Sequence, residues 1–186
     1  MTRLICFGDS ITAGHEGHEE PLLTKKIAEA LPDYEILNKG VSGNNTNDAI
    51  RRIDRDVLSH NPDIVTVLFG ANDAAFHKMV PLSTYKNNLR EIVRKIYPST
   101  CVLLTPTPVD ETKQFRRTNS VLEEYAEAVS EVAREMKCPL IDVFSTMIRR
   151  KDYPYLVKGQ QDDGLHIGEA GYAVLCQLIV QTLREI

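Results

Sequence analysis

The apolar run at residues 64–69, IVTVLF, constrains the fold more than any other stretch of the chain. It is almost purely apolar and rich in β-branched side chains, which predicts a strand buried on both faces. A strand of this kind lies at the centre of a sheet that helices cover on both sides. The sequence around the run fits this arrangement, because turn signals and helical patterns precede and follow it.

Segments with strand and helix patterns alternate along the whole chain. We expect strands at residues 3–8, 34–38, 64–69, 101–105 and 140–144. The remaining periodic segments predict helices over residues 21–31, 46–60, 83–97, 118–137, 145–150 and 169–186, with Thr46, Ser83 and Thr118 as N-caps. This alternation predicts an α/β fold with a five-stranded parallel sheet. No repeat, low-complexity tract or linker interrupts it, so we expect residues 1–186 to form a single domain.

Charge and cysteine usage exclude several classes of function. The formal net charge is −4 and the acidic and basic residues are interspersed, so we expect no nucleic-acid partner. No apolar run approaches membrane-spanning length and no signal peptide precedes the first strand, so we expect a cytoplasmic protein without membrane insertion. The four cysteines are scattered without a CxxC pair, which predicts free thiols rather than a zinc site: Cys6, Cys101, Cys138 and Cys176.

The stretch FGDSITAG, residues 7–14, carries the best candidate for a nucleophile. Ser10 follows a predicted buried strand that Gly8 breaks. A small hydroxyl on a tight turn at the carboxyl end of a parallel strand is well placed for nucleophilic attack. Serine at such a turn also commonly caps a helix, so the assignment depends on whether the rest of the chain supplies a base.

A base and its orienting acid are found together near the carboxyl terminus. Asp163 and His166 lie three residues apart in DGLH, where a bend can bring the carboxylate to one ring nitrogen. The other nitrogen can then face Ser10, as in a Ser-His-Asp triad. Asp162 is adjacent, and on the residues alone either aspartate could serve.

Three groups could stabilise an oxyanion beside Ser10. Gly43 allows its backbone N–H to approach closely, Asn72 offers a neutral side-chain donor, and the N–H of Ser10 is a third donor. Each also has a structural interpretation, since Gly43 could simply permit a left-handed turn and Asn72 could tie down its own turn.

These blocks, in this order, resemble the SGNH or GDSL-type esterase and lipase family. Ser10 in FGDSIT, Gly43 in GVSGNNT, Asn72 in GAND and His166 in DGLH match the four residues for which that family is named. The resemblance favours Asp163 over Asp162 as the third triad member. It implies a flavodoxin-like three-layer α/β/α sandwich and hydrolysis of carboxylic esters or thioesters. The chain departs from the family pattern in reading GDSI rather than GDSL, and in having Ile167 where proline is frequent.

Several other polar and apolar residues near these blocks have two interpretations. We expect Asp9 and Asp73 to brace their loops, and Arg116 and Arg117 to lie in a solvated loop rather than to bind an anionic substrate. The acidic and histidine-bearing loop after Gly14 could hold a metal, but a solvated loop is favoured: His15, Glu16, His18, Glu19 and Glu20. Four apolar residues could line an acyl pocket or only cover the sheet edge: Phe76, Met79, Val80 and Leu82.

Taken together, these residues predict a serine esterase that needs no cofactor or metal and acts on small-molecule esters with short acyl chains. Short chains are expected because no insertion is long enough to form a lid. The same site could instead serve a carbohydrate O-deacetylase, an acyl-thioesterase or a lysophospholipase. A flavodoxin-like nucleotide-binding module is the non-enzyme alternative, but the first turn is not GxGxxG and Asp9 would repel a phosphate there. The sequence leaves the oligomeric state open.

Overall fold

The computed structural model describes residues 1–15 and 19–186 and is built on one sheet of five parallel strands. Its strands are β1 (Thr2–Gly8), β2 (Tyr34–Gly40), β3 (Ile64–Leu68), β4 (Thr100–Leu104) and β5 (Leu140–Ile141), in the spatial order β2-β1-β3-β4-β5. This is the flavodoxin-like order, in which the connections leave in opposite directions on the two sides of β1. The predicted five-stranded parallel sheet is confirmed.

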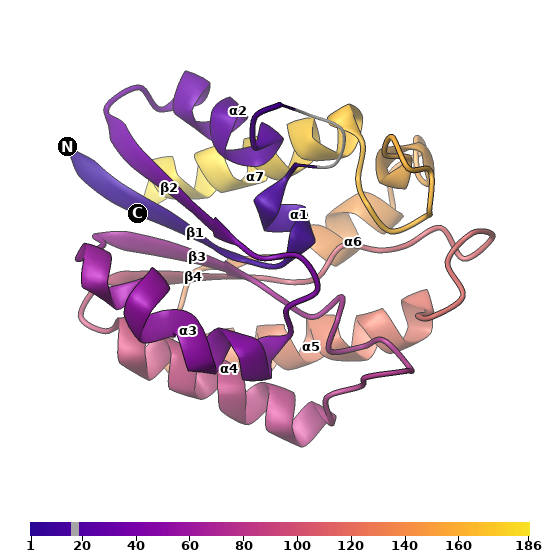
Figure 1. Ribbon diagram of the computed structural model, residues 1–186, viewed down its shortest axis with the longest axis horizontal. Helices are drawn as coiled ribbons and strands as arrows, with labels where there is room; N and C mark the ends of the chain where they lie inside the picture. The colour runs from indigo at the N-terminus through magenta and orange to yellow at the C-terminus, as the bar shows by residue number, and fades with distance from the viewer. Residues whose placement is uncertain (16–18) are drawn as a thin grey trace.

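Helices cover both faces of the sheet, which confirms the predicted three-layer α/β/α sandwich (Figure 1). The first face carries α2 (Leu22–Ala30) and α7 (Glu169–Glu185), with the short helices α1 (Ser10–Ala13) and α6 (Val143–Ile148). The second face carries α3 (Thr46–Asp56), α4 (Leu82–Ile96) and α5 (Asn119–Met136). Two 3₁₀ turns complete the described elements, η1 (Leu58–His60) and η2 (Tyr155–Val157).

Alternate residues of the central strands point to opposite faces and enter two separate cores. Ile5 and Phe7 of β1 pack with the α3, α4 and α5 layer, whereas Leu4 and Cys6 pack with the α2 and α7 layer. In β3, Val65 packs on the same side as Ile5 and Phe7. Because both faces of the central strands are buried, these strands show no alternation of polar and apolar residues. All of these side chains are completely buried. The sheet is therefore packed on both faces, and the loops that follow its strands begin from buried, well-packed positions.

Several predicted boundaries are wrong. The strand expected at 140–144 ends at Ile141, because Asp142 accepts a hydrogen bond from the Ser145 N–H and caps α6. The cap of α3 is Asn45 rather than Thr46, with Asp48 completing a capping box. Helix α3 also stops at Asp56, before the η1 turn. The predicted Ser83 cap is inside α4, which begins after Pro81 without a side-chain cap.

The cysteines are free thiols: Cys6, Cys101 and Cys176 are buried and Cys138 is partly buried. Within the described residues, no helix combines the length and apolar character that a membrane crossing requires.

The carboxyl ends of the strands form one edge of the sheet, and long loops gather there (Figure 1). In an open parallel sheet, ligands bind at this edge near the point where the strand order reverses. Here that point lies beside β1, which pairs with β2 on one side and with β3 on the other. The turn after β1, which carries Ser10, therefore lies at the expected site.

Candidate active site

Ser10 lies on a turn that is packed tightly from both sides. A Cβ at Gly8 would lie 2.1 Å from the Thr12 hydroxyl and 2.6 Å from the Leu68 carbonyl, so only glycine fits before the turn. Asp9 caps α1 by accepting a hydrogen bond from the Ile11 N–H at 3.0 Å. Ser10 is thus the first residue of α1 and not its cap. Its hydroxyl is free of a capping role, and the residue is 7% exposed.

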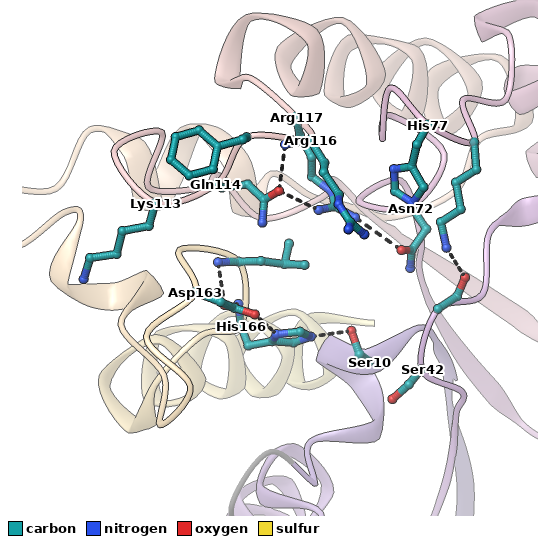
Figure 2. A pocket seen from close by; sticks show the side chains of 14 residues that line it. Ser10, Ser42, Asn72, His77, Lys113, Gln114, Arg116, Arg117, Asp163 and His166 are labelled. Carbon is teal, nitrogen blue, oxygen red and sulfur yellow. Dashed lines mark hydrogen bonds and ion pairs between the residues drawn. The ribbon is translucent and has the colours of Figure 1, made fainter.

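His166 links Ser10 to Asp163 in a continuous line of hydrogen bonds (Figure 2). The His166 Nε2 atom is 3.0 Å from the Ser10 Oγ, and the His166 Nδ1 atom is 2.6 Å from Asp163 Oδ2. The other carboxylate oxygen accepts the backbone N–H groups of Leu165 and His166, each at 2.9 Å. This turn needs Gly164, whose φ is +73°. The bend expected from the DGLH spacing is therefore formed.

The two adjacent aspartates have different partners. Burial opposes ionisation of Asp163, but the N–H groups of His166 and Leu165 outweigh it and hold the pKa of Asp163 below its ordinary value. Asp162 instead faces Lys113 at 2.5 Å, with both side chains well exposed. Of the two aspartates, Asp163 is the one that contacts the histidine. A carboxylate that stays ionised can fix the histidine tautomer and stabilise its protonated form.

Gly43 and Ser10 both line the cavity, and each carries a backbone N–H that could serve as a donor. Gly43 has φ +81°, and its carbonyl accepts a hydrogen bond from the Lys78 Nζ at 2.8 Å. Among the described residues, no protein acceptor binds the N–H of Gly43 or the N–H of Ser10. The left-handed turn and the donor role of Gly43 are compatible, because the turn leaves this N–H unused.

The Asn72 side chain is held at both ends of its amide. Its Nδ2 donates to the Asn44 carbonyl at 2.9 Å, and its Oδ1 accepts from Arg117 at 3.3 Å. The arginine fixes which end of the amide is oxygen, since a guanidinium can only donate. One N–H of the amide remains for a ligand, and Asn72 lines the cavity beside Ser10. Asn72 therefore ties together two loops rather than only its own turn.

Arg117 corrects one expectation from the sequence. It does not lie in a solvated loop: it is 4% exposed, and its Nε donates to the Ala71 carbonyl. Burial, together with the positive charge of Arg116, lowers the pKa of Arg117, while Asp9 counters that shift. An arginine beside another arginine in a polar loop carries no local signal of burial, because its partners lie far back in the sequence. Arg116 is exposed, as expected.

Two buried carboxylates brace the floor of the site. Asp73 accepts hydrogen bonds from the N–H and the hydroxyl of Thr46, at 2.9 and 2.5 Å, and Asp9 caps α1. The bracing role expected for both is confirmed. Burial raises the pKa of Asp9 to about 6 against the hydrogen bond from Ile11. Burial likewise raises the pKa of Asp73 to about 6, although the hydrogen bonds from Thr46 oppose it. Both groups therefore make folding less favourable as the pH rises and they ionise.

Ser10 and His166 open into a cavity of about 480 Å³. Loop 74–82 contributes His77 and Lys78 to its lining and not its four apolar residues. Of those four, Val80 is buried and Leu82 packs against the core, while Phe76 and Met79 are exposed. The interpretation of these residues as cover is thus correct for Val80 and Leu82, and the acyl-pocket interpretation is not supported.

The described residues contain no group of three or more histidine, cysteine or acidic side chains that could hold a metal ion. Glu16 and His18 of the loop after Gly14 lie outside the described residues.

This arrangement has the parts of acyl transfer by a serine. A hydroxyl lies within hydrogen-bond distance of an imidazole, the imidazole contacts an ionised carboxylate, and residues with unused N–H donors line the same cavity. A group that attacks, a group that accepts a proton and donors for a developing oxyanion are the features by which such sites are identified.

Comparison with known proteins identifies the family of this chain. Residues 6–174 match the GDSL-like lipase/acylhydrolase family. A GDSL esterase/lipase of Arabidopsis thaliana is 32% identical, with 98% of this chain and 86% of that protein aligned. The human isoamyl acetate-hydrolyzing esterase 1 homolog is 31% identical, with 91% of this chain and 76% of that protein aligned.

Solved structures share the fold over the whole chain. The lipase/acylhydrolase from Enterococcus faecalis has a TM-score of 0.93 and 28% identity, and the match covers 100% of this chain and 96% of that one. Axe2, an acetylxylan esterase from Geobacillus stearothermophilus, has a TM-score of 0.79 at 23% identity over 98% of this chain and 94% of that one. This chain therefore belongs to the GDSL-like lipase/acylhydrolase family and is a carboxylic ester hydrolase.

Proposed function

We propose that the protein is a serine esterase that hydrolyses short-acyl esters of small alcohols through an acyl-enzyme at Ser10. The observation that carries this proposal is the line of contacts from Ser10 to His166 to Asp163, with distances of 3.0 and 2.6 Å. Ser10 is the nucleophile, His166 is the general base and then the general acid, and Asp163 orients the imidazole.

Each half of the reaction uses the same groups. His166 Nε2 takes the Ser10 proton as Oγ attacks the ester carbonyl carbon. The negative charge that forms on the carbonyl oxygen is bound by the N–H groups of Ser10 and Gly43 and by the Asn72 amide. His166 then donates its proton to the leaving alcohol, and the acyl group remains on Ser10. Water, deprotonated by His166, releases the acid and restores the serine.

The cavity favours a small acyl group. Leu165 and Phe115 are the apolar side chains larger than alanine that line it, and Phe115 is 82% exposed. An enclosing tunnel would add about 0.8 kcal/mol for each buried methylene, and this polar cavity supplies no such surface. The human relative is named as a homolog of an isoamyl acetate-hydrolyzing esterase, which agrees with a short acyl group.

The proposal is tested with p-nitrophenyl acetate on two serine variants from the same cavity. Ser10 and Ser42 both line it (Figure 2), but only Ser10 contacts His166. Ser10→Ala should abolish turnover without loss of structure by circular dichroism, whereas Ser42→Ala should retain it. A Ser10→Ala variant that keeps a substantial fraction of the wild-type rate would refute the mechanism.

Substrate class is tested with a series of p-nitrophenyl esters from acetyl to dodecanoyl, each below its critical micelle concentration. We expect kcat/KM to be greatest between acetyl and butyryl and to fall by octanoyl. A monotonic rise to dodecanoyl would show an acyl channel and contradict the short-acyl assignment. Acetylated xylosides and acetyl-thioesters are run beside the series, and faster turnover of either would contradict the assignment to simple esters.

A further inference from the structure

The lining of the cavity is rich in basic side chains. It includes five of them: His77, Lys78, Lys113, Arg116 and Arg117. The one acidic residue among the lining residues is Asp163, and its carboxylate is already occupied by the histidine and two backbone N–H groups. The chain as a whole has a net charge of −4. A concentration of positive charge in one cavity of an acidic protein indicates that the cavity attracts negative ligands.

Two of these cations keep their charge uncompensated. Arg117 is buried against backbone and amide oxygens, and Lys113 is paired with Asp162. Among the residues that the structure describes, the polar contact of the Lys78 ammonium is a neutral carbonyl, that of Gly43. The Arg116 guanidinium makes no hydrogen bond or ion pair with any of the residues the structure describes. Lys78 and Arg116 are therefore available to a ligand.

The backbone holds Arg116 in place even though its side chain is exposed. Its N–H donates to the Gln114 side chain at 3.0 Å, and its carbonyl accepts the Phe76 N–H at 2.8 Å. The second bond joins the loop of Arg116 to the loop of Lys78, so the two cations lie on linked segments. Figure 2 shows Arg116 across the cavity from Ser10 and His166. Their field reaches His77, whose pKa is lowered by desolvation and then by Arg116 and Lys78.

We propose that the preferred substrate is an anionic ester, in which the leaving alcohol carries a negatively charged group that Lys78 and Arg116 bind. This inference rests on the proposed function, because a short acyl group at Ser10 leaves the rest of the cavity to the alcohol. The Arg116 side chain determines specificity and does not touch the reacting atoms. Exposed cations attract an anion modestly, so we expect about a tenfold gain in kcat/KM, which salt should reduce.

The test uses three aryl acetates of nearly equal shape and different charge. They are 3-acetoxybenzoate, 3-acetoxybenzamide and 3-acetoxy-N,N,N-trimethylanilinium, each normalised to its own rate of alkaline hydrolysis. At low salt we expect kcat/KM to be greatest for the anion and lowest for the cation. About 0.5 M sodium chloride should bring the three values together. Equal values for the anion and the amide at low salt would overturn the proposal.

Two variants locate the effect. Arg116→Gln should lower the ratio of kcat/KM for 3-acetoxybenzoate to kcat/KM for 3-acetoxybenzamide at least about threefold. Arg90→Gln makes the same charge change on α4, where Arg90 pairs with Glu135, and should leave the ratio as in the wild type. An unchanged ratio in Arg116→Gln would overturn the assignment of this side chain. If the ester bond of 3-acetoxybenzamide is hydrolysed in a reaction that needs Ser10, and 3-acetoxybenzoate is not preferred over it, this inference alone is refuted. Failure to hydrolyse any of the three esters would refute the proposed function itself.

Discussion

Replacing Asp163 with asparagine isolates the contribution of its charge. The asparagine side chain has the same shape, and its oxygen can still accept the N–H groups of Leu165 and His166, so the turn is kept. The amide nitrogen then faces His166 Nδ1, where the carboxylate oxygen was at 2.6 Å. An amide N–H can only donate, so it favours the tautomer with the proton on Nε2. In that tautomer the imidazole cannot accept the proton of Ser10.

The expected loss of rate follows from the contacts that change. Asp163→Asn would remove a hydrogen bond to a charged group, worth about 1.5–3 kcal/mol, and reaching the productive tautomer would leave two donors facing each other, at about 1–3 kcal/mol. The protonated imidazole of the transition state also loses its counter-charge. The two contacts sum to about 2.5–6 kcal/mol and the lost counter-charge adds to this, so kcat should fall by about 10³–10⁴-fold, while KM changes little. The loss should be smaller than that of His166→Ala.

The assay compares Asp163→Asn with Asp162→Asn on p-nitrophenyl acetate. Asp162 is the matched control, since the same chemical change there breaks only an exposed ion pair with Lys113. Its φ of +48° is one that asparagine tolerates, so we expect a rate within about twofold of the wild type. If Asp162→Asn is the damaging change, or if Asp163→Asn stays within about tenfold of the wild type, the assignment of the orienting acid is wrong.

Three further substitutions test single contacts of the site. Asn72→Ala should lower kcat by about 10²–10³-fold with little change in KM, and a change confined to KM would contradict an oxyanion role. A lysine at position 117 cannot bind both the Ala71 carbonyl and the Asn72 side chain, so Arg117→Lys alone should lower kcat about tenfold. Added to Asn72→Ala, the same substitution should lower kcat hardly further, and a double-mutant cycle would measure this coupling. The Asp9 carboxyl, with its pKa raised to about 6, binds its proton more tightly folded than unfolded, so wild-type stability falls as pH rises through this window. In urea unfolding, the free energy of unfolding of Asp9→Asn should therefore rise by up to about 3 kcal/mol relative to that of the wild type between pH 4 and pH 7. A difference between the two proteins that does not change with pH would refute the raised pKa of Asp9.

Most of the fold could be predicted because its signals are local. The apolar run at residues 64–69 required a doubly covered strand, and the amphipathic segments supplied the covering helices. The errors occur where a single side chain decides a boundary. Asp142 ends β5 by capping α6, and α1, with four residues, is too short to show helical periodicity.

The candidate site could be located because the topology brings the right loops together. Ser10 and Asn72 follow the adjacent strands β1 and β3, so their proximity follows once the strands are paired. The buried arginine that holds Asn72 in place could not be predicted in this way. Arg117 contacts Ala71 and Asn72 across about 45 residues of sequence, and nothing in its own neighbourhood indicates burial.

The central claim is that Ser10 is an activated nucleophile, and covalent labelling tests it most directly. A fluorophosphonate reacts with a serine hydroxyl only when a neighbouring base activates it, and peptide mapping by mass spectrometry locates the adduct. We predict one adduct per chain, on the peptide that contains Ser10, and its loss in both Ser10→Ala and His166→Ala. Labelling that persists in Ser10→Ala, or an adduct located on Ser42, would contradict the account.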